Sequence, residues 1–275
     1  MFFESSILSV FYILGGLIII QTNLHNPTFR CHHASGTDEE YILQAIAARY
    51  KEIGFSDHSP FIPYEGCKQS GYRVYFEDCE DYFQSLTSLR EKYKDQIQIH
   101  IGFEMEYYPE YFDSMLSMVK DLGAEYLILG QHFLASDVDH GFYSGIATDN
   151  VDHLKKYCEL AVEGLSTGVF TYLAHPDLIH FTGDMEVYEE TMRDMIQRII
   201  RMDYPLEMNR LGYYEKRNYP MESFWKIAGE EKARCLIGLD AHAPEVYDDK
   251  ETIAQVEQYL KNFGLTPEKP IVKPL

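Results

Sequence analysis

The sequence predicts an α/β fold in which short parallel strands alternate with helices around a closed barrel. Seven short aliphatic or β-branched runs recur along the 275 residues, and most gaps between them hold an amphipathic segment of helical length. Each run also stops near a residue that can hold a metal ion. A chain of this length can bury one large core, so we expect a single domain.

The runs and the candidate ligands that end them fall into seven stretches. These are Asn23–His33, Lys51–His58, Ile97–Glu104, Tyr126–His132, Thr171–His175, Pro205–Asn209 and Arg234–His242. Their candidate ligands lie 28 to 46 positions apart, which is the length of a βα unit. A closed ring of parallel strands brings all carboxyl ends to one face, where barrel enzymes carry their chemistry. We therefore expect these side chains to converge on one pocket.

The N-terminal end of the first run allows two interpretations. Residues 7–20 are almost wholly apolar, but they are few for a membrane span, and no Lys or Arg precedes Arg30. We expect residues 17–24 to form the first strand of a barrel domain over residues 17–275, after an N-terminal extension over residues 1–16. The alternative is that this segment is a signal or an anchor.

Helices are predicted in the gaps between the runs. Thr37 with Glu40 three residues later matches a capping box, so we expect a helix from there to about Tyr50. Further helices are predicted over Asp78–Tyr93, Tyr111–Leu122, Val151–Gly164, Glu186–Met202, Glu222–Glu230 and Tyr247–Phe263.

Three segments rich in Gly, Pro and polar residues are predicted to be loops over the carboxyl-end face. They are Ser59–Arg73, Ala135–Asn150 and Leu211–Pro220. Loops at this position usually provide substrate contacts. The tail from Thr266 is expected to be a surface segment.

Charge and cysteine content exclude several classes of function. Lys plus Arg number 24 against 44 Asp plus Glu, and the net charge of −20 disfavours binding to nucleic acid or to an anionic membrane. The five cysteines include no Cys-x-x-Cys pair, so neither a disulfide framework nor a thiolate zinc site is indicated. This composition fits a cytoplasmic protein, whose oligomeric state the sequence leaves open.

The motifs, taken in order from Thr22 to Pro244, carry a family resemblance. They are Leu24–Gly36, Gly54–Pro60, Gly102–Glu104, Gly130–His132, Ala174–Asp177, Leu206–Gly212 and Gly238–Pro244. Together they resemble the polymerase-and-histidinol-phosphatase (PHP) family, and within it the histidinol-phosphatase branch.

The resemblance implies a distorted seven-stranded (β/α) barrel, of the TIM-barrel type, with a centre of up to three divalent ions. Zinc, iron and manganese all suit imidazole and carboxylate ligands. In the implied assignment, the first ion takes His25, Glu104 and Asp240, the second shares Glu104 and adds His132 and His175, and the third takes His33, His58 and His242.

The sequence departs from the family pattern at one position. The family's first motif is His-x-His, and its second histidine falls on Pro27, which has no ligand atom. Three ligands remain for that ion and water could complete its shell, so weaker binding and an empty site are both open. A weakened or non-catalytic metal-binding member is therefore an alternative.

The resemblance predicts a hydrolase for phosphoric monoesters, most specifically a histidinol-phosphatase of histidine biosynthesis. A metal-bound hydroxide would attack the phosphorus, and Asp240 or His242 would assist proton transfer. Arg30 and Arg217 are the expected phosphate contacts, because a guanidinium binds phosphate with two parallel hydrogen bonds. A phosphotyrosine phosphatase or another small-molecule phosphatase is the enzymatic alternative.

Overall fold

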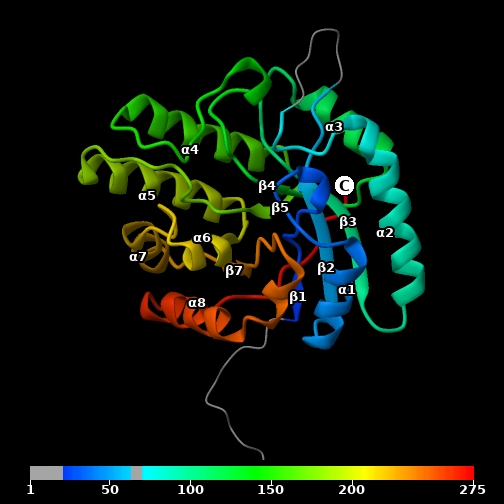
Figure 1. Cartoon of the computed structure of the whole chain (residues 1–275). Coiled ribbons are helices and arrows are strands. Elements are labelled where there is room, and N and C mark those ends of the chain that lie inside the picture. Colours follow the sequence, from blue (N-terminus) through cyan, green and yellow to red (C-terminus); the bar gives the residue numbers. More distant parts are fainter. Residues whose placement is uncertain (1–20, 63–69) are drawn as a thin grey trace, which may run out of the picture.

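The computed structural model describes residues 21–62 and 70–275, and its centre is a sheet of seven parallel strands (Figure 1). The strands pair in sequence order, each with the next along the chain. They are β1 (Thr22–Asn23), β2 (Glu52–His58), β3 (Gln98–Met105), β4 (Leu127–Leu129), β5 (Phe170–Leu173), β6 (Leu206–Asn209) and β7 (Cys235–Gly238).

Two hydrogen bonds bring the ends of the sheet together. The backbone N–H of Leu239 donates to the side-chain oxygen of Asn23 at 3.0 Å, and that of Ala241 donates to the carbonyl of His25 at 3.2 Å. The segment after β7 therefore lies against the segment after β1. The predicted α/β barrel of seven strands is confirmed in a nearly closed form.

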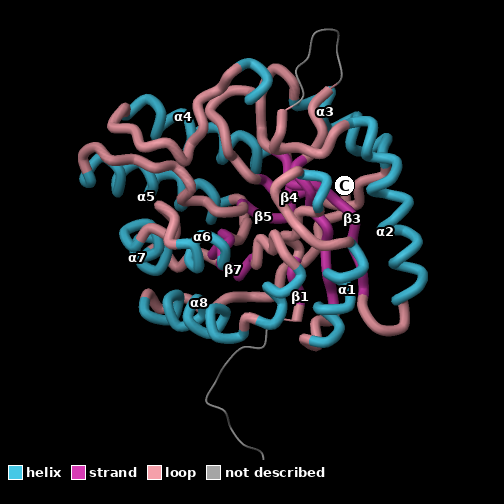
Figure 2. The backbone as a smooth tube through the Cα atoms, viewed as in Figure 1, coloured by secondary structure: helices cyan, strands magenta, loops and turns pink. Residues whose placement is uncertain are grey.

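The helices lie around the outside of the strands, as the tube in Figure 2 shows. They are α1 (Asp38–Ala47), α2 (Cys79–Tyr93), α3 (Phe112–Leu122), α4 (Val151–Ser166), α5 (Met185–Arg201), α6 (Arg210–Glu215), α7 (Glu222–Glu230) and α8 (Lys250–Asn262). Among the residues described, no helix combines the length and the apolar character that a membrane crossing needs.

Alternation along the strands divides the core into two parts. Leu127 and Leu129 of β4 belong to the large core between sheet and helices, whereas Tyr126 and Ile128 pack with the residues inside the barrel. Successive side chains of a strand point to opposite faces, so both faces of this sheet are covered. The inner cluster consists of Leu24, Tyr126, Ile128, Tyr172, Ala174 and Leu236.

The predicted capping box at Thr37 is present. Its hydroxyl accepts from the backbone N–H of Glu40, and the Glu40 carboxylate accepts from the backbone N–H of Thr37 at 2.7 Å. The predicted helices all occur, with ends shifted by a few residues. The shifts are greatest at the end of α1 and at the start of α8, where a 3-10 turn over Pro244–Asp248 precedes the helix.

One sequence expectation needs correction. The segment expected as a loop over residues 211–220 begins with the helix α6, which the side chain of Asn209 caps by accepting from the N–H of Gly212 at 2.9 Å. The first strand covers Thr22–Asn23 within the described chain. Residues 17–20 of the expected strand and the extension over residues 1–16 lie outside the described residues.

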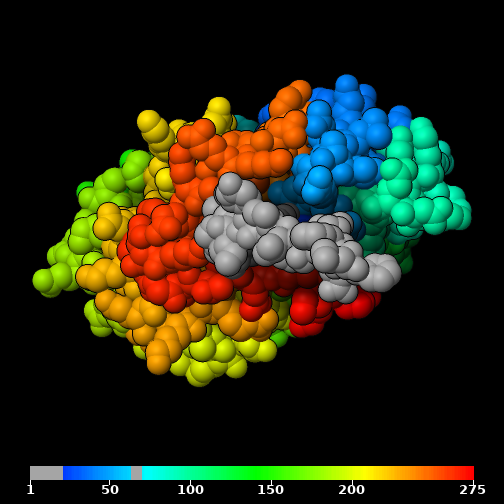
Figure 3. All heavy atoms as spheres, turned by 90° about the horizontal axis from the view of Figure 1, so that it is seen from below, coloured from blue at the N-terminus to red at the C-terminus, as the bar shows by residue number. Residues whose placement is uncertain are grey.

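The C-terminal tail crosses the amino ends of the strands. The N–H of Glu268 donates to the carbonyl of Cys235 at 2.8 Å, and the N–H of Leu275 donates to that of Glu125 at 3.1 Å. Figure 3, the view from below, shows C-terminal residues in red on this face. The tail therefore covers this end of the barrel. The candidate ligands lie at the opposite end, which the tail leaves open.

Candidate active site

The strand ends place the predicted ligands at one end of the barrel. His58 ends β2 and lies in register with Glu104 of β3. His25, His132, His175, Asp240 and His242 each follow a strand by two to four residues. The backbones of His175 and Asp240 have φ angles of 29° and 49°, in the left-handed region that residues with a Cβ rarely adopt. Such strain is typical of functional sites.

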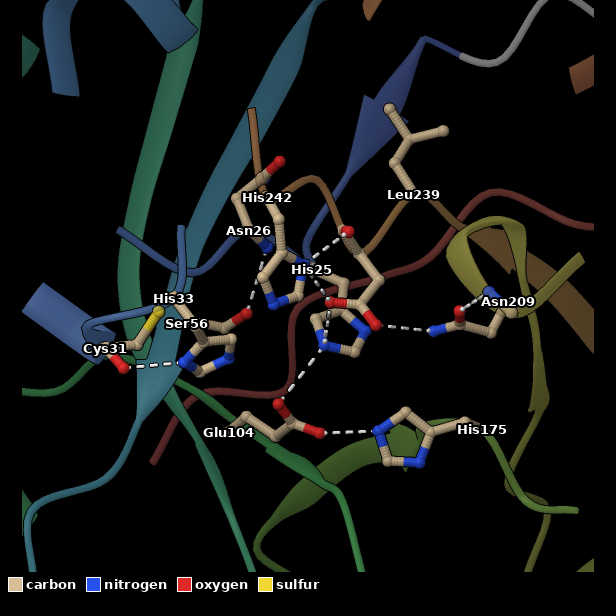
Figure 4. A network of polar contacts seen from close by, with 12 residues as sticks. His25, Asn26, Cys31, His33, Ser56, Glu104, His175, Asn209, Leu239 and His242 are labelled. Carbon is tan, nitrogen blue, oxygen red and sulfur yellow. Dashed lines mark hydrogen bonds and ion pairs between the residues drawn. The ribbon is translucent and has the colours of Figure 1, made fainter. Parts of the chain in front are cut away.

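Glu104 is the centre of the cluster, and Figure 4 shows its contacts with His25 and His175. One carboxylate oxygen lies 2.8 Å from Nε2 of His175 and 3.4 Å from Nε2 of His132. The other oxygen lies 3.3 Å from Nε2 of His25 and 3.6 Å from Nδ1 of His58. Four imidazoles from four different strand ends therefore surround one buried carboxylate.

The imidazoles keep the Glu104 carboxyl ionised. Burial by itself would raise its pKa, but the surrounding histidines and the hydrogen bond from His175 hold the pKa well below its usual range. The carboxylate also needs the glycine at position 130, because a Cβ built there would overlap the Glu104 side chain.

Asp240 and Glu207 lie on either side of His25. Nε2 of His25 is 3.4 Å from Asp240, and Nδ1 is 2.8 Å from Glu207. Burial opposes a charge on His25, but Glu207, Asp240 and Glu104 raise its pKa well above the usual value. His25 in turn lowers the pKa of the buried Asp240 carboxyl, which stays ionised.

The third expected group, His33, His58 and His242, is also brought together. The ring centroid of His33 lies 5.5 Å from that of His58 and 4.9 Å from that of His242. Nδ1 of His33 lies 2.6 Å from the carbonyl of Cys31, and Nδ1 of His242 lies 3.0 Å from that of Asp240. Because a carbonyl only accepts, both Nδ1 atoms carry hydrogen and both Nε2 atoms are left for another partner.

His58 is neutral at physiological pH. Burial, together with the neighbouring His132 and His33, lowers its pKa to about 3 despite the opposing effect of Glu104. A metal ion binds the neutral imidazole, so His58 is in the form that a ligand requires.

The donor set fits divalent metal ions. His25, Glu104 and His175 offer ligand atoms within 4.8 Å of one another, and so do His58, Glu106 and His132. Nδ1 of the buried His175 has no hydrogen-bond partner within the described chain. Clustered imidazole nitrogens around carboxylates suit zinc, iron or manganese. The second group contains Glu106, which the ligand assignment from sequence did not include.

Sequence reasoning missed Arg73 and Asp137, which form a buried charged group with Glu106. The Arg73 guanidinium donates to Glu106 and to Asp137, each at 2.8 Å, and Glu106 lies 3.1 Å from Nδ1 of His132. Arg73 is 3% exposed, which an arginine in a predicted loop does not suggest. Its partners are 33 and 64 residues away, so no local pattern signals them.

The two arginines expected to bind phosphate lie in different places. Arg217 lines the cavity, where it donates to the Tyr219 hydroxyl at 3.0 Å. Arg30 is not among the cavity residues, and this expectation needs correction. Its guanidinium is buried and donates to Asp38 and Asp81 at 2.7 to 3.1 Å. These carboxylates hold the guanidinium outside the cavity.

A cavity of about 520 Å³ opens over the cluster. Its floor holds the carboxylates and imidazoles, and aromatic rings line part of its wall. Phe133 lies between Tyr72 and Tyr143, with ring centroids 6.4 Å and 5.4 Å away. The other lining residues are His33, His58, Arg73, Glu104, Glu106, His132, Asp137, Gly145, Ile146, His175, Leu178, Arg217, Asn218, Tyr219, Asp240 and His242.

Comparisons with known proteins agree with this arrangement. The family model of the PHP domain matches residues 23–211. Histidinol-phosphatase of Bacillus subtilis is 27% identical over 232 residues, which cover 81% of this chain and 75% of the relative. A Lactococcus lactis histidinol phosphate phosphatase, solved with zinc, L-histidinol and phosphate, is 16% identical with a TM-score of 0.69, covering 93% of this chain and 98% of that one. The structural likeness shows a shared fold.

Proposed function

The chain belongs to the PHP domain family, and from this membership we propose that it hydrolyses L-histidinol phosphate to L-histidinol and phosphate. The observation that carries the proposal is the convergence of four imidazoles on the buried Glu104 beneath an open cavity. The names of the Bacillus subtilis and Lactococcus lactis relatives support this substrate, which is an intermediate of histidine biosynthesis.

The proposed centre holds up to three divalent ions, zinc, iron or manganese. Bound ions would polarise a phosphoryl oxygen and lower the pKa of a coordinated water. The proposed ligands are His25, His33, His58, Glu104, His132, His175, Asp240 and His242. The grouping of His58 with His132 and Glu106 supports one ion, and that of His25 with Glu104 and His175 supports another.

Asp240 and His242 are the proposed catalytic residues. Asp240 is ionised, so it can accept a hydrogen bond from a water molecule and orient it. His242 lines the cavity, and its Nδ1 hydrogen is engaged by the Asp240 carbonyl at 3.0 Å. When no ion occupies its Nε2, that nitrogen can take a proton from the attacking water and return it to the departing alkoxide oxygen of the substrate.

The rest of the cavity offers one contact for the phosphate group, Arg217, and one surface for the leaving group, the aromatic rings of its wall. A guanidinium supplies positive charge and paired donors to a phosphoryl group, so Arg217 is the proposed phosphate contact. Tyr72, Phe133 and Tyr143 offer ring faces to a flat group such as the imidazole of histidinol.

The aromatic rings of Tyr72, Phe133 and Tyr143 also favour a second candidate, a phosphotyrosine phosphatase, because the phenyl ring of phosphotyrosine can pack against them as well. A weakened or non-catalytic member is the third candidate, and Pro27 is the observation that favours it. These alternatives predict different outcomes when metal content and substrate range are measured together.

The test is phosphate release from L-histidinol phosphate, phosphotyrosine and a panel of small phosphomonoesters, with elemental analysis of protein purified without added metal. We expect bound divalent metal and a kcat/KM for histidinol phosphate at least about tenfold above that of the other substrates, equal to ~1.4 kcal/mol of transition-state discrimination. A preference for phosphotyrosine would establish the second candidate. Bound metal without turnover would establish the third.

We also propose a cytoplasmic location and a small-molecule phosphomonoester as the only substrate class, with no nucleic-acid partner. Cys31, Cys79, Cys158 and Cys235 are free and buried, which supports a reducing compartment. The net charge of −20 supports the absence of a nucleic-acid partner.

A further inference from the structure

Glu207 contacts the candidate metal ligands from beneath. One of its carboxylate oxygens is 2.8 Å from Nδ1 of His25, and the other accepts the backbone N–H of His175 at 3.0 Å. The amide of Asn209 donates to Glu207 and to Asp240, at 3.2 Å in each case. The Glu207 carboxylate thereby connects the ends of β1 and β5, and Asn209 links it to Asp240 after β7.

The Glu207 carboxylate fits beside β7 because the neighbouring residue there is a glycine. Glu207 is fully buried, and Gly238 of β7 lies beside it, in register with Asn209. A Cβ built on Gly238 would overlap the Glu207 carboxylate. A buried carboxylate is expensive unless its oxygens are hydrogen-bonded, and those of Glu207 have three partners in His25, His175 and Asn209.

The contact with His25 decides which ring nitrogen is free to bind metal. A carboxylate only accepts, so Nδ1 of His25 carries the hydrogen, and in the neutral ring that binds metal Nε2 keeps its lone pair. Nε2 lies 3.3 Å from Glu104 and 3.4 Å from Asp240. We propose that Glu207 is a positioning residue that holds His25 in the orientation and tautomer that bind a divalent ion through Nε2. This inference rests on the metal centre of the proposed function.

Because position 27 is a proline, the contact between Glu207 and His25 should affect metal affinity more strongly. The ion at His25, Glu104 and Asp240 lacks the ligand that the family motif provides at position 27, so its affinity depends more on the geometry of the ligands that remain. Removing an outer carboxylate from a metal-binding histidine typically lowers metal affinity about 10- to 100-fold. Among the described ion pairs, Glu207 pairs with His25 and with no arginine or lysine, so no other cation competes with His25 for its negative charge.

The test is Glu207→Gln, with zinc titrated into the metal-stripped full-length protein. The donors of His175 and Asn209 keep the amide oxygen on their side, so the amide nitrogen faces Nδ1 of His25. An N–H at this place favours a hydrogen on Nε2 and so blocks coordination. We expect one zinc site to weaken about 10- to 100-fold while the others keep their affinity. In ¹⁵N NMR spectra of zinc-loaded protein, the coordinated His25 nitrogen should be Nε2 in the wild type and should lose its coordination shift in the variant.

Two further variants separate positioning from a general loss of packing. Glu257→Gln removes another buried carboxylate, on α8 and 1% exposed, and should leave zinc binding unchanged. Gly238→Ala displaces the Glu207 carboxylate without removing it and should weaken the same zinc site as Glu207→Gln. Thermal unfolding of each metal-stripped variant shows whether it folds.

The outcomes distinguish this inference from the function on which it rests. Wild-type protein that binds no zinc, iron or manganese would overturn both. Wild-type protein that binds zinc, with a folded Glu207→Gln variant of equal affinity and with Nε2 of His25 still coordinated, would overturn the positioning role alone.

Discussion

Pro27 lies two residues after His25, in the segment that leaves the first strand, and has no atom that can bind a metal. The residues on either side of Pro27 form hydrogen bonds with strand β2. Asn26 donates to the carbonyl of Gly54 at 2.7 Å, and Thr28 donates its backbone N–H to Asp57 at 3.2 Å. These side chains therefore do not replace the missing ligand, and the first ion keeps His25, Glu104 and Asp240.

We predict that Pro27→His strengthens zinc binding at this ion. An added imidazole supplies a fourth ligand, which should raise the affinity about tenfold, or ~1.4 kcal/mol, and increase phosphatase turnover. Isothermal titration of metal-stripped protein with zinc measures the affinity. Pro27→Ala is the matched control, because it removes the ring without adding a nitrogen. Equal zinc affinity in the histidine and alanine variants would show that position 27 does not face the ion.

The two arginines chosen from sequence should respond differently to substitution. Arg217→Gln removes a charged donor from the cavity, so kcat/KM for the phosphomonoester should fall about 10- to 100-fold, corresponding to ~1.5–3 kcal/mol. Its ion pair with Glu215 is exposed, so the free energy of unfolding should change by less than about 1 kcal/mol.

Arg30→Gln is expected to do the reverse. It breaks a buried pair with Asp38, in which both side chains are 4% exposed, so the free energy of unfolding should fall by roughly 3–5 kcal/mol. The kcat/KM of the folded fraction should remain near the wild-type value. Urea denaturation and steady-state kinetics on both variants measure the two effects. A large loss of kcat/KM without loss of stability in Arg30→Gln would restore Arg30 as a phosphate contact.

Among the secondary-structure elements, those with a local signal were predictable. Thr37 and Glu40 fix the start of α1 through a capping box that needs only residues three apart. The carboxyl ends of parallel strands necessarily share one face, so the convergence of His58, His175 and Glu104 also followed from spacing.

Elements that depend on distant partners were not predictable from local patterns. Helix α6 exists because Asn209 caps it, in a segment whose Gly, Tyr and Pro content indicates a loop. Arg30 follows a ligand motif, but Asp81, 51 residues later, turns it away from the cavity. Glu207 adjoins a recognisable Asn209 motif, yet only the packing of β6 against His25 reveals its contact.

Arg73 joins two loops over the barrel, the one after β2 and the one after β4. Its guanidinium pairs with Asp137 in the 3-10 turn Asp137–Asp139 and with Glu106 after β3. We predict that Arg73→Met lowers the free energy of unfolding by roughly 3–5 kcal/mol, because two buried carboxylates lose the guanidinium and only Glu106 keeps an ion-pair partner, in His132.

The matched variant is Arg73→Met combined with Asp137→Asn, which removes one of the two carboxylate charges that lose the guanidinium and should recover part of the loss. Chemical denaturation of both proteins and of the wild type gives the comparison. If the double variant is no more stable than Arg73→Met, the ion pair with Asp137 contributes little, and the destabilisation comes from lost packing of the arginine.

For the whole molecule, the metal centre links strand ends that lie far apart in the chain. Metal ions held by His25, Glu104, His132 and His175 would connect β1, β3, β4 and β5 across the barrel. A ligand that binds only the folded state stabilises it by RT ln(1 + [L]/Kd), about 4 kcal/mol when free zinc is a thousandfold above Kd. We therefore predict that stripping the metal lowers Tm by roughly 8–16 °C, given about 2–4 °C per kcal/mol in large domains.

The stabilisation by zinc should increase with pH, because zinc competes with the proton on His25. Burial opposes its charge, but Glu207, Asp240 and Glu104 raise its pKa well above 6.5. In the metal-free protein, the stability contributed by protonated His25 is complete below pH 6.5 and is lost as the pH rises through the raised pKa. Zinc requires the neutral ring and competes with that proton, so zinc stabilises the folded protein more as the pH rises.

The Tm difference between zinc-loaded and stripped protein should therefore be larger at pH 8 than at pH 6 by scanning calorimetry. Glu257→Gln is the control, and its Tm difference should change with pH as in the wild type. A difference that is constant or that shrinks with rising pH would show that His25 does not bind the ion.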